Sequence, residues 1–135
     1  MIDRAVRSAV AERAAQRCEY CLLPRADHCW PFHVEHITPR QHGGDDSLDN
    51  LAFACPRCNF NKGTNLTTID PETGEITPLF NPRVHTWADH FQVVQGTIRG
   101  LTEIGRATVR LMRMNAENRR DLRNELTSEF DVFEE

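Results

Sequence analysis

The chain has 135 residues, of which 39% are hydrophobic and 27% charged, and its formal net charge is −4. This length fits one domain with a small core, and the composition is ordinary for a soluble globular protein. No stretch approaches the roughly 20 apolar residues that cross a membrane. The charged N-terminus lacks the apolar region of a signal peptide, so we expect a cytoplasmic protein without a membrane partner.

The acidic net charge is unevenly distributed. Residues 1–66 hold eight basic and eight acidic side chains, whereas residues 83–123 hold eight arginines against four acids. The last twelve residues hold five acids and no base. Because an acidic end can hide a basic region in the total, the net charge does not exclude a partner such as nucleic acid.

The first part of the chain predicts a helix followed by two short strands. Residues 2–17 are rich in Ala, Arg and Glu, which favours a helix. A loop follows over residues 22–31, and the run 32–37 predicts a strand. Residues 38–50 are rich in turn formers and predict a second loop. The apolar run 51–54 predicts the second strand.

A short helix is predicted over about residues 56–62, because Pro56 suits its first position and Gly63 its end. Residues 67–80 predict a hairpin with its turn at Pro71–Gly74. From Trp87 onward the pattern is helical, with a break expected at Gly96–Gly100 and a long helix over 102–127. We expect Trp87 and Phe91, four residues apart, to pack in the core.

Four of the five cysteines form two C-x-x-C pairs, and the fifth, Cys29, lies outside this pattern. The paired residues are Cys18, Cys21, Cys55 and Cys58. An odd count without a signal peptide argues against a disulfide framework. Zn²⁺ prefers tetrahedral coordination, and two C-x-x-C turns can supply its four thiolates. We therefore predict a structural zinc site, the alternatives being a redox dithiol or four unrelated buried thiols.

The 33 residues between the cysteine pairs exceed what a simple zinc ribbon uses, so a further unit is inserted there. This region and the helix after it carry Glu35, His36, Asn50 and Asn59. Carboxylate and amide oxygens suit a hard divalent cation, and a neighbouring histidine can act as a base.

Residues 18–66 resemble the HNH endonucleases, which have a ββα-metal fold. The resemblance rests on Glu35-His36, Gly43-Gly44, Asn50-Leu51 and the sequence C-P-R-C-N-x-x-K-G, with 14 residues from His36 to Asn50 and 9 from Asn50 to Asn59. It implies a ββα-metal core over residues 18–66. With the elements predicted on either side, we expect a single α+β domain: a zinc-stapled ββα-metal core with an N-terminal helix, and a hairpin and helical C-terminal extension over residues 67–135.

The resemblance also implies site roles. His36 would be the general base, Asn50 would brace the loop between the strands, and Glu35 and Asn59 would bind the catalytic cation. The motif is thus H-N-N rather than H-N-H, and the family more often has Asp at the position of Glu35. Neighbouring strand residues face opposite sides, so Glu35 and His36 can converge only where the strand ends or bulges. Thr38-Pro39 favours a strand end.

These residues predict a metal-dependent endonuclease that hydrolyses phosphodiester bonds. His36 would take a proton from water, and Mg²⁺ or Mn²⁺ held by Glu35 and Asn59 would stabilise negative charge. The zinc cannot do so, because four thiolates leave no open position. DNA is the expected partner, with RNA as an alternative. A non-catalytic zinc module that binds nucleic acid or protein is the rival hypothesis.

Several basic side chains are candidates for phosphate contacts: Lys62, Arg106, Arg110 and Arg113. Lys62 in the last helical turn could instead interact with the helix dipole. The three arginines follow helical spacing and could track phosphates, or they could form a solvated helix face. His33 could line the metal pocket, or it could be a packed or surface histidine.

Overall fold

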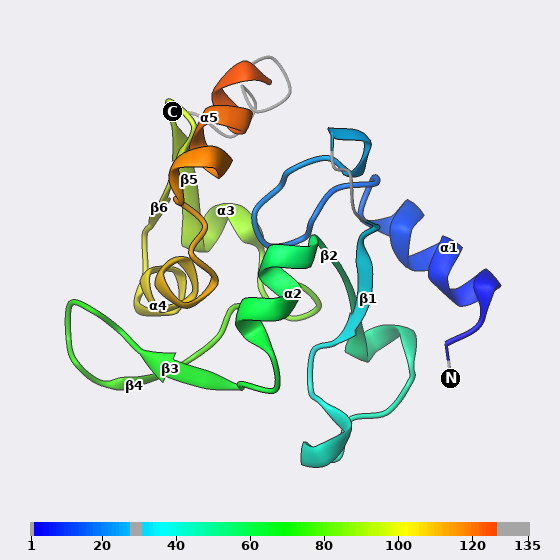
Figure 1. The fold of residues 1–135 in the computed structure, drawn as a ribbon. Helices are drawn as coiled ribbons and strands as arrows, with labels where there is room; N and C mark the ends of the chain where they lie inside the picture. Colours follow the sequence, from blue (N-terminus) through cyan, green and yellow to red (C-terminus); the bar gives the residue numbers. More distant parts are fainter. Residues whose placement is uncertain (1, 28–30, 127–135) are drawn as a thin grey trace. The chain divides into compact units, whose positions relative to one another are not determined.

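Figure 1 shows the computed structural model of the chain, whose described residues form an α+β fold of short helices and three two-stranded sheets. The structure describes residues 2–27 and 31–126, so Cys29 lies outside the described residues. Two compact units are present: Met1–Leu66 with Asn81–Arg83, and Thr67–Phe80 with Val84–Glu135. Because Asn81–Arg83 belong to the first unit, the chain is not simply divided after residue 66, and the expected boundary there stays a prediction.

The N-terminal helix α1 (Arg4–Arg13) is shorter than the predicted segment 2–17. Asp3 caps it, because its carboxylate accepts a hydrogen bond from a backbone N–H of the first turn at 2.9 Å. The helix ends before Ala15 and Gln16, whose φ angles of 55° and 60° lie in the left-handed region. This local backbone reversal turns the chain toward the first cysteine pair.

The two predicted strands are confirmed as β1 (His33–His36) and β2 (Leu51–Ala54). They pair antiparallel, with His36 opposite Leu51 and Glu35 opposite Ala52. Single-turn 3-10 helices occupy the loops around them: η1 (Arg25–Asp27), η2 (Arg40–His42) and η3 (Leu48–Asn50). The strand β1 ends at His36, as the following Thr-Pro pair predicts.

The predicted short helix is confirmed as α2 (Pro56–Lys62), with Pro56 in its first turn and Gly63 after its end. Two helices cover the β1–β2 sheet on opposite faces (Figure 1). Val34 packs against the apolar cluster under α1, while its neighbour Glu35 contacts Lys62 of α2. The buried members of that cluster are Val10, Ala11, Leu51 and Phe53.

The second unit begins with the predicted hairpin, observed as β3 (Thr67–Ile69) and β4 (Ile76–Pro78). Trp87 and Phe91 pack with ring centroids 4.9 Å apart; Phe91 is buried as expected, whereas Trp87 is only half-buried. The remaining elements are α3 (Trp87–His90), β5 (Phe91–Val94), β6 (Thr97–Gly100), α4 (Glu103–Met112) and α5 (Glu117–Glu125).

The helical prediction from Trp87 onward is wrong after one turn, because β5 and β6 form a second hairpin. Gln95 and Gly96 at its tip have φ angles of 50° and 80°, and two residues with positive φ are typical of a tight hairpin turn. Val93 pairs with Ile98, and both are buried, which fits the alternation of a strand better than helical spacing.

The long helix predicted over 102–127 is also wrong, since α4 and α5 are separate; residue 127 lies outside the described residues. Arg113 takes a left-handed φ of 51° at the end of α4. In the link between α4 and α5, the Asn115 side chain accepts a hydrogen bond from the Ile98 N–H and donates one to the Ile98 carbonyl oxygen, both at 2.8 Å. Arg119 donates to two carbonyl oxygens at the end of α4, at 2.7 and 3.0 Å. The Arg119 contacts thus satisfy backbone carbonyls that a continuous helix would have paired, while Asn115 attaches the link to β6.

Candidate functional site

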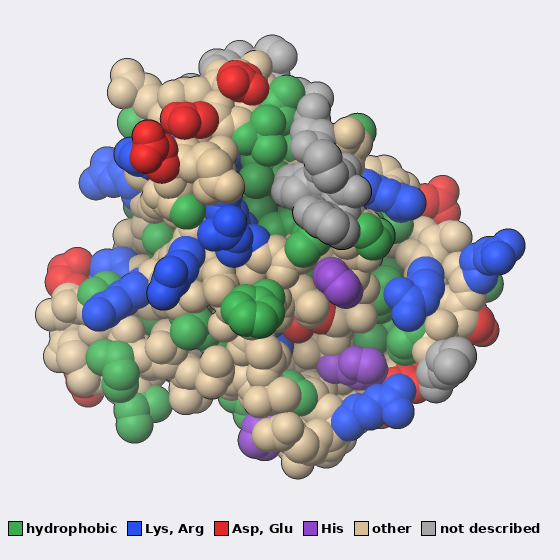
Figure 2. Space-filling model, viewed as in Figure 1, with side chains coloured by type: hydrophobic (Ala, Val, Ile, Leu, Met, Phe, Trp, Pro, Cys, Tyr) green, Lys and Arg blue, Asp and Glu red, His purple; other side chains and the backbone are tan. Residues whose placement is uncertain are grey.

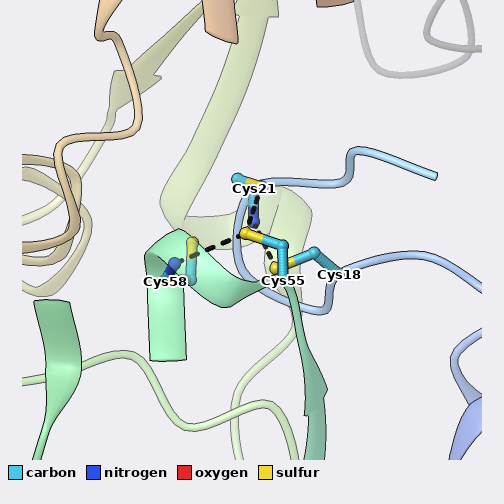
Figure 3. Close-up of side chains that lie close together, drawn as sticks. All are labelled: Cys18, Cys21, Cys55 and Cys58. Carbon is cyan, nitrogen blue, oxygen red and sulfur yellow. Dashed lines mark hydrogen bonds between the residues drawn. The ribbon is translucent and has the colours of Figure 1, made fainter. Parts of the chain in front are cut away.

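The four paired cysteines come together at the junction of α2 with the turn that follows α1. Figure 3 shows their side chains pointing toward one another, and their sulfur atoms all lie within 4.8 Å. All four residues are buried and none forms a disulfide. Four thiols converging from two C-x-x-C turns match the donor set of a structural zinc ion, so the cluster fits the zinc site predicted from the spacing.

Burial raises the pKa of the Cys18 and Cys58 thiols well above their ordinary value. Without metal, these thiols therefore hold their protons at neutral pH, whereas a bound zinc ion requires thiolates and displaces the protons. The two backbone N–H groups of Cys21 and Cys58 point at the Cys18 and Cys55 sulfur atoms at 3.4 Å each. Such N–H groups stabilise negative sulfur, which again suits a metal.

A separate pocket of about 400 Å³ lies beside the end of β1. Its lining includes His33, Glu35, His36, Arg40, Asn59 and Thr64. Three of the four residues predicted to perform or support chemistry thus line one pocket, together with His33. Asn59 is supplied by α2 and is half-buried, whereas Glu35 is 6% exposed.

Both carboxylate oxygens of Glu35, a predicted metal ligand, already have partners inside the fold. One carboxylate oxygen accepts a hydrogen bond from the Tyr20 hydroxyl, and the other lies 3.1 Å from the Lys62 ammonium. Burial raises the pKa of the Glu35 carboxyl, and the positive charge of Lys62 opposes this change. Burial and the nearby Glu35 charge also raise the pKa of Tyr20, so its hydroxyl stays protonated and can donate.

The suggested phosphate contact of Lys62 does not fit the structure. The residue is 2% exposed. Besides Glu35, its ammonium group donates to the carbonyl oxygens of His36 and Ile37 at 3.2 and 3.0 Å. Three donors meet three acceptors, so the side chain joins α2 to the end of β1 and has no N–H left for a phosphate.

His36 has a partner that spacing alone did not indicate. Its Nε2 atom lies 2.7 Å from the Asp46 carboxylate, which Arg40 also contacts at 2.8 and 3.0 Å. The hydrogen bond with His36 lowers the pKa of the Asp46 carboxyl. An ionised carboxylate can only accept, so Nε2 carries the proton and the lone pair of a neutral His36 lies on Nδ1.

Asn50 makes the bracing contacts that the sequence predicts. Its side chain accepts from the Thr38 N–H at 2.8 Å and donates to the carbonyl oxygens of Thr38 and Asp45 at 2.9 and 2.8 Å. Gly44 lies inside this closure, since a Cβ atom there would be 1.6 Å from the Thr38 oxygen. The loop that carries Asp46 is therefore fixed at both ends next to His36.

The arginines proposed as a phosphate stripe belong to the second unit. Arg106 forms two hydrogen bonds to the buried Asp70 at 3.1 and 2.8 Å, and it also pairs with Glu72 at 3.2 Å. Its guanidinium therefore joins α4 to the end of the first hairpin of that unit. Arg110 and Arg113 are exposed. The stripe is thus reduced to two available side chains, and its role in binding stays a prediction.

Sequence reasoning missed Tyr20, Arg40 and Asp46. Tyr20 stands between two cysteines, where its spacing indicates only a zinc turn. Asp46 is one of three acids in a loop, and nothing in the linear order distinguishes it from Asp45 or Asp49. The one available signal was that a base needs an orienting carboxylate within reach, and the loop that follows β1 is rich in them.

Comparisons with known proteins agree with the motifs. Residues 18–65 match the family model of the HNH endonuclease. The Septu protein PtuB of Bacillus thuringiensis is 26% identical over 112 residues, which cover 82% of this chain and 41% of PtuB. The chain thus spans less than half the length of that relative. No solved structure matches the chain.

Among residues 2–27 and 31–126, no helix has the length and apolar character needed to span a bilayer. The family match covers both cysteine pairs, β1, β2 and α2, which are the elements that form the cluster and the pocket. The resemblance predicted from the motifs is therefore confirmed: residues 18–65 of this chain match the HNH endonuclease family.

Proposed function

We propose that this protein is a metal-dependent endonuclease that hydrolyses phosphodiester bonds in nucleic acid, with DNA as the favoured substrate. The observation that carries the proposal is the pocket at the end of β1, where an oriented histidine, a carboxylate and a carboxamide face one space. Nuclease activity in general is what the family match indicates. The individual roles below belong to the proposal.

His36 is the proposed general base. Asp46 holds its Nε2–H, so Nδ1 is free to accept a proton from a water molecule in the pocket. Arg40 donates to both oxygens of Asp46, including the one that contacts His36, and limits the movement of this carboxylate. Asn50 holds the loop in place through three hydrogen bonds. Such fixed orientation of a base is what allows proton transfer in the transition state without reorganisation.

Glu35 and Asn59 are the proposed ligands of a catalytic cation, which when bound would stabilise negative charge on the phosphate and the leaving oxygen. The donor atoms fit a hard ion such as Mg²⁺ or Mn²⁺, since a carboxylate has about four lone-pair positions and Tyr20 and Lys62 use two of them. Because Lys62 neutralises Glu35, the protein adds little net negative charge. We therefore expect weak cation binding until a substrate phosphate is present.

The four-cysteine cluster has a structural role in this proposal. Its two pairs connect the turn after α1 to the first turn of α2, and α2 carries Asn59 into the pocket. A zinc ion there would fix α2 against the sheet. Buried thiolates on all four sides would leave it no position for water or substrate.

The main alternative is a non-catalytic zinc module that binds nucleic acid or protein. One observation favours it: both oxygens of Glu35 already have partners inside the fold. A carboxylate used only to hold α2 to β1 would need no cation. The two hypotheses differ in whether His36 matters, because a binding module has no use for a base held by Asp46.

Nicking of supercoiled plasmid DNA by the full chain tests the proposal. We expect nicking with Mg²⁺ or Mn²⁺ and its loss with His36→Ala, at unchanged zinc content and thermal stability. Removing a general base lowers rates by about 10²–10⁴-fold. His42→Ala is the matched control, since His42 is an exposed loop histidine that we assign no role. Equal nicking by both variants would favour another base, and failure of the folded wild type to nick DNA or RNA would favour the binding module.

A further inference from the structure

A second hollow in the first unit lies between α1 and the segment that enters β1, and its volume is about 190 Å³. We propose that it binds the sugar-phosphate backbone of nucleic acid within a few nucleotides of the cleavage point. We call it the arginine groove, because Arg4, Arg7 and Arg25 line it. The inference rests on the proposed function, since it names how the substrate of that same pocket would be held.

The charges of the groove are available to a ligand. Arg4 and Arg7 are three residues apart on α1, so they lie on the same face of the helix. All three arginines are exposed. Arg25 donates to the neutral side chain of Gln16 at 3.1 Å. Within the part of the chain that the structure describes, none of the three guanidinium groups is paired with a carboxylate.

The floor of the groove is apolar. Phe32 and Phe53 lie there with ring centroids 5.2 Å apart, and Ala11 and Val34 complete it. Phe53 is 4% exposed, so its contribution is a packed surface and not a free ring for base stacking. Guanidinium groups around an apolar floor match a ligand that alternates phosphates with sugars, because each class of atom meets its complement.

The position of the groove favours a nucleic acid over an acidic protein. Val34 lines both this groove and the pocket that holds His36. From Phe32 to His36 is four residues, which on an extended strand is about 13 Å. That distance corresponds to about four base-pair steps along the axis of a duplex. Figure 2 shows basic side chains over α1 on the same face as histidines over β1 and the loop that follows it.

The experiment uses the 135-residue chain that carries His36→Ala, so that binding is measured without cleavage. Affinity for a fluorescent DNA duplex is measured by fluorescence anisotropy at salt concentrations between about 50 and 200 mM. Arg4→Gln, Arg7→Gln and Arg25→Gln are each added, singly and together. Arg99→Gln is the matched control, because Arg99 is exposed in the second unit and has no assigned role.

The slope of log affinity against log salt is negative. We expect each single groove substitution to make it shallower by about 0.9, and the triple substitution by about 2.7. Arg7→Lys should keep most of the slope because it keeps the charge. Arg99→Gln should leave the slope unchanged. Zinc content and thermal unfolding check that each variant is folded. We expect all of them to fold, because the substituted side chains are exposed.

The groove and the proposed function can fail separately. If wild-type protein cuts DNA while the triple variant keeps its affinity and salt slope, the groove is not a nucleic-acid site. The same conclusion follows if polyglutamate of equal charge competes as well as DNA. If the triple variant loses binding but wild-type protein cuts nothing, the groove stands and the nuclease proposal is wrong.

Discussion

Removing the Lys62 ammonium should strongly destabilise the first unit. In the native protein this group lies 3.1 Å from Glu35 and also donates to two carbonyl oxygens, and both charged side chains are at most 5% exposed. Lys62→Met keeps most of the apolar stem but leaves a buried carboxylate with Tyr20 as its remaining donor. Breaking a buried ion pair in this way costs about 3–5 kcal/mol, a large part of the roughly 5–15 kcal/mol that holds a domain folded.

The effect should depend on pH with a definite sign. Burial already raises the pKa of Glu35, and Lys62 is the main influence that opposes this shift. Without Lys62 the pKa of Glu35 in the folded state rises further above its unfolded value. A group with a raised folded pKa favours the native state at low pH and loses that contribution as pH rises through the folded pKa. The penalty of Lys62→Met should therefore be smallest near pH 4.5, where the lost hydrogen bonds to the two carbonyl oxygens still count, and largest at pH 8.

Urea unfolding of zinc-loaded protein at several pH values measures this penalty. The double variant Glu35→Gln with Lys62→Met is the matched control, since it removes both charges and should recover part of the lost stability with a flatter pH dependence. A cost below about 1 kcal/mol at pH 8, the range of an exposed pair, would contradict the buried ion pair. So would a penalty that is equal at both ends of the pH range.

Three further outcomes are expected. Asn50→Ala removes three side-chain hydrogen bonds from the loop and should lower the free energy of unfolding by about 1–3 kcal/mol. Cleavage should also be lost, because the loop carries Asp46, the partner of the proposed base His36. Full activity would show that the Asn50 hydrogen bonds are dispensable. Cys58→Ser should lower zinc from about one ion per chain to none by elemental analysis and should lower the melting temperature, whereas retained zinc would contradict the cluster. The hydrogen bonds from Arg106 lower the pKa of Asp70. Asp70 therefore stabilises the native state above its ordinary pKa, and this stabilisation is lost as pH falls below about 4. Asp70→Asn should flatten the pH dependence of acid unfolding in that range, and an unchanged profile would mean that the pair contributes nothing.

The ββα core could be predicted because local signals agree there. Each C-x-x-C pair indicates a metal turn, Pro56 and Gly63 bound the short helix, and Asn50 stands where a loop must be closed. These features depend on residues close in sequence or on a spacing that zinc geometry restricts. The structure places them as expected, with the strand ending at His36.

The second unit was harder to predict because tertiary contacts decide it. The segment from Trp87 has enough helical spacing to suggest one long pattern, yet Gln95-Gly96 turns it into a hairpin and Asn115 binds the backbone of β6. Arg119 adds to the basic excess of residues 83–123, but it is buried against the end of α4. A linear pattern does not show which polar side chain will satisfy a backbone group far along the chain.

The sequence indicated several of the residues that line the pocket, but not their connections, and their roles stay predictions. The sequence indicates Glu35 and His36 as a pair of functional groups, whereas their partners Tyr20 and Asp46 come from a zinc turn and a loop. These contacts change the expected chemistry. Lys62 and Tyr20 restrain the carboxylate of Glu35. Asp46 determines which ring nitrogen of a neutral His36 can accept a proton.

Plasmid nicking by zinc-loaded protein, followed while Mn²⁺ is titrated from zero in buffer cleared of divalent cations, tests directly whether the pocket at the end of β1 is a metal-dependent nuclease site. We expect no nicking before Mn²⁺ is added, saturable nicking afterwards, and a constant zinc content of about one ion per chain by elemental analysis. Asn59→Ala should shift the titration to higher Mn²⁺. Full nicking in EDTA with zinc still bound, or no nicking at any Mn²⁺ concentration by folded protein, would contradict this mechanism.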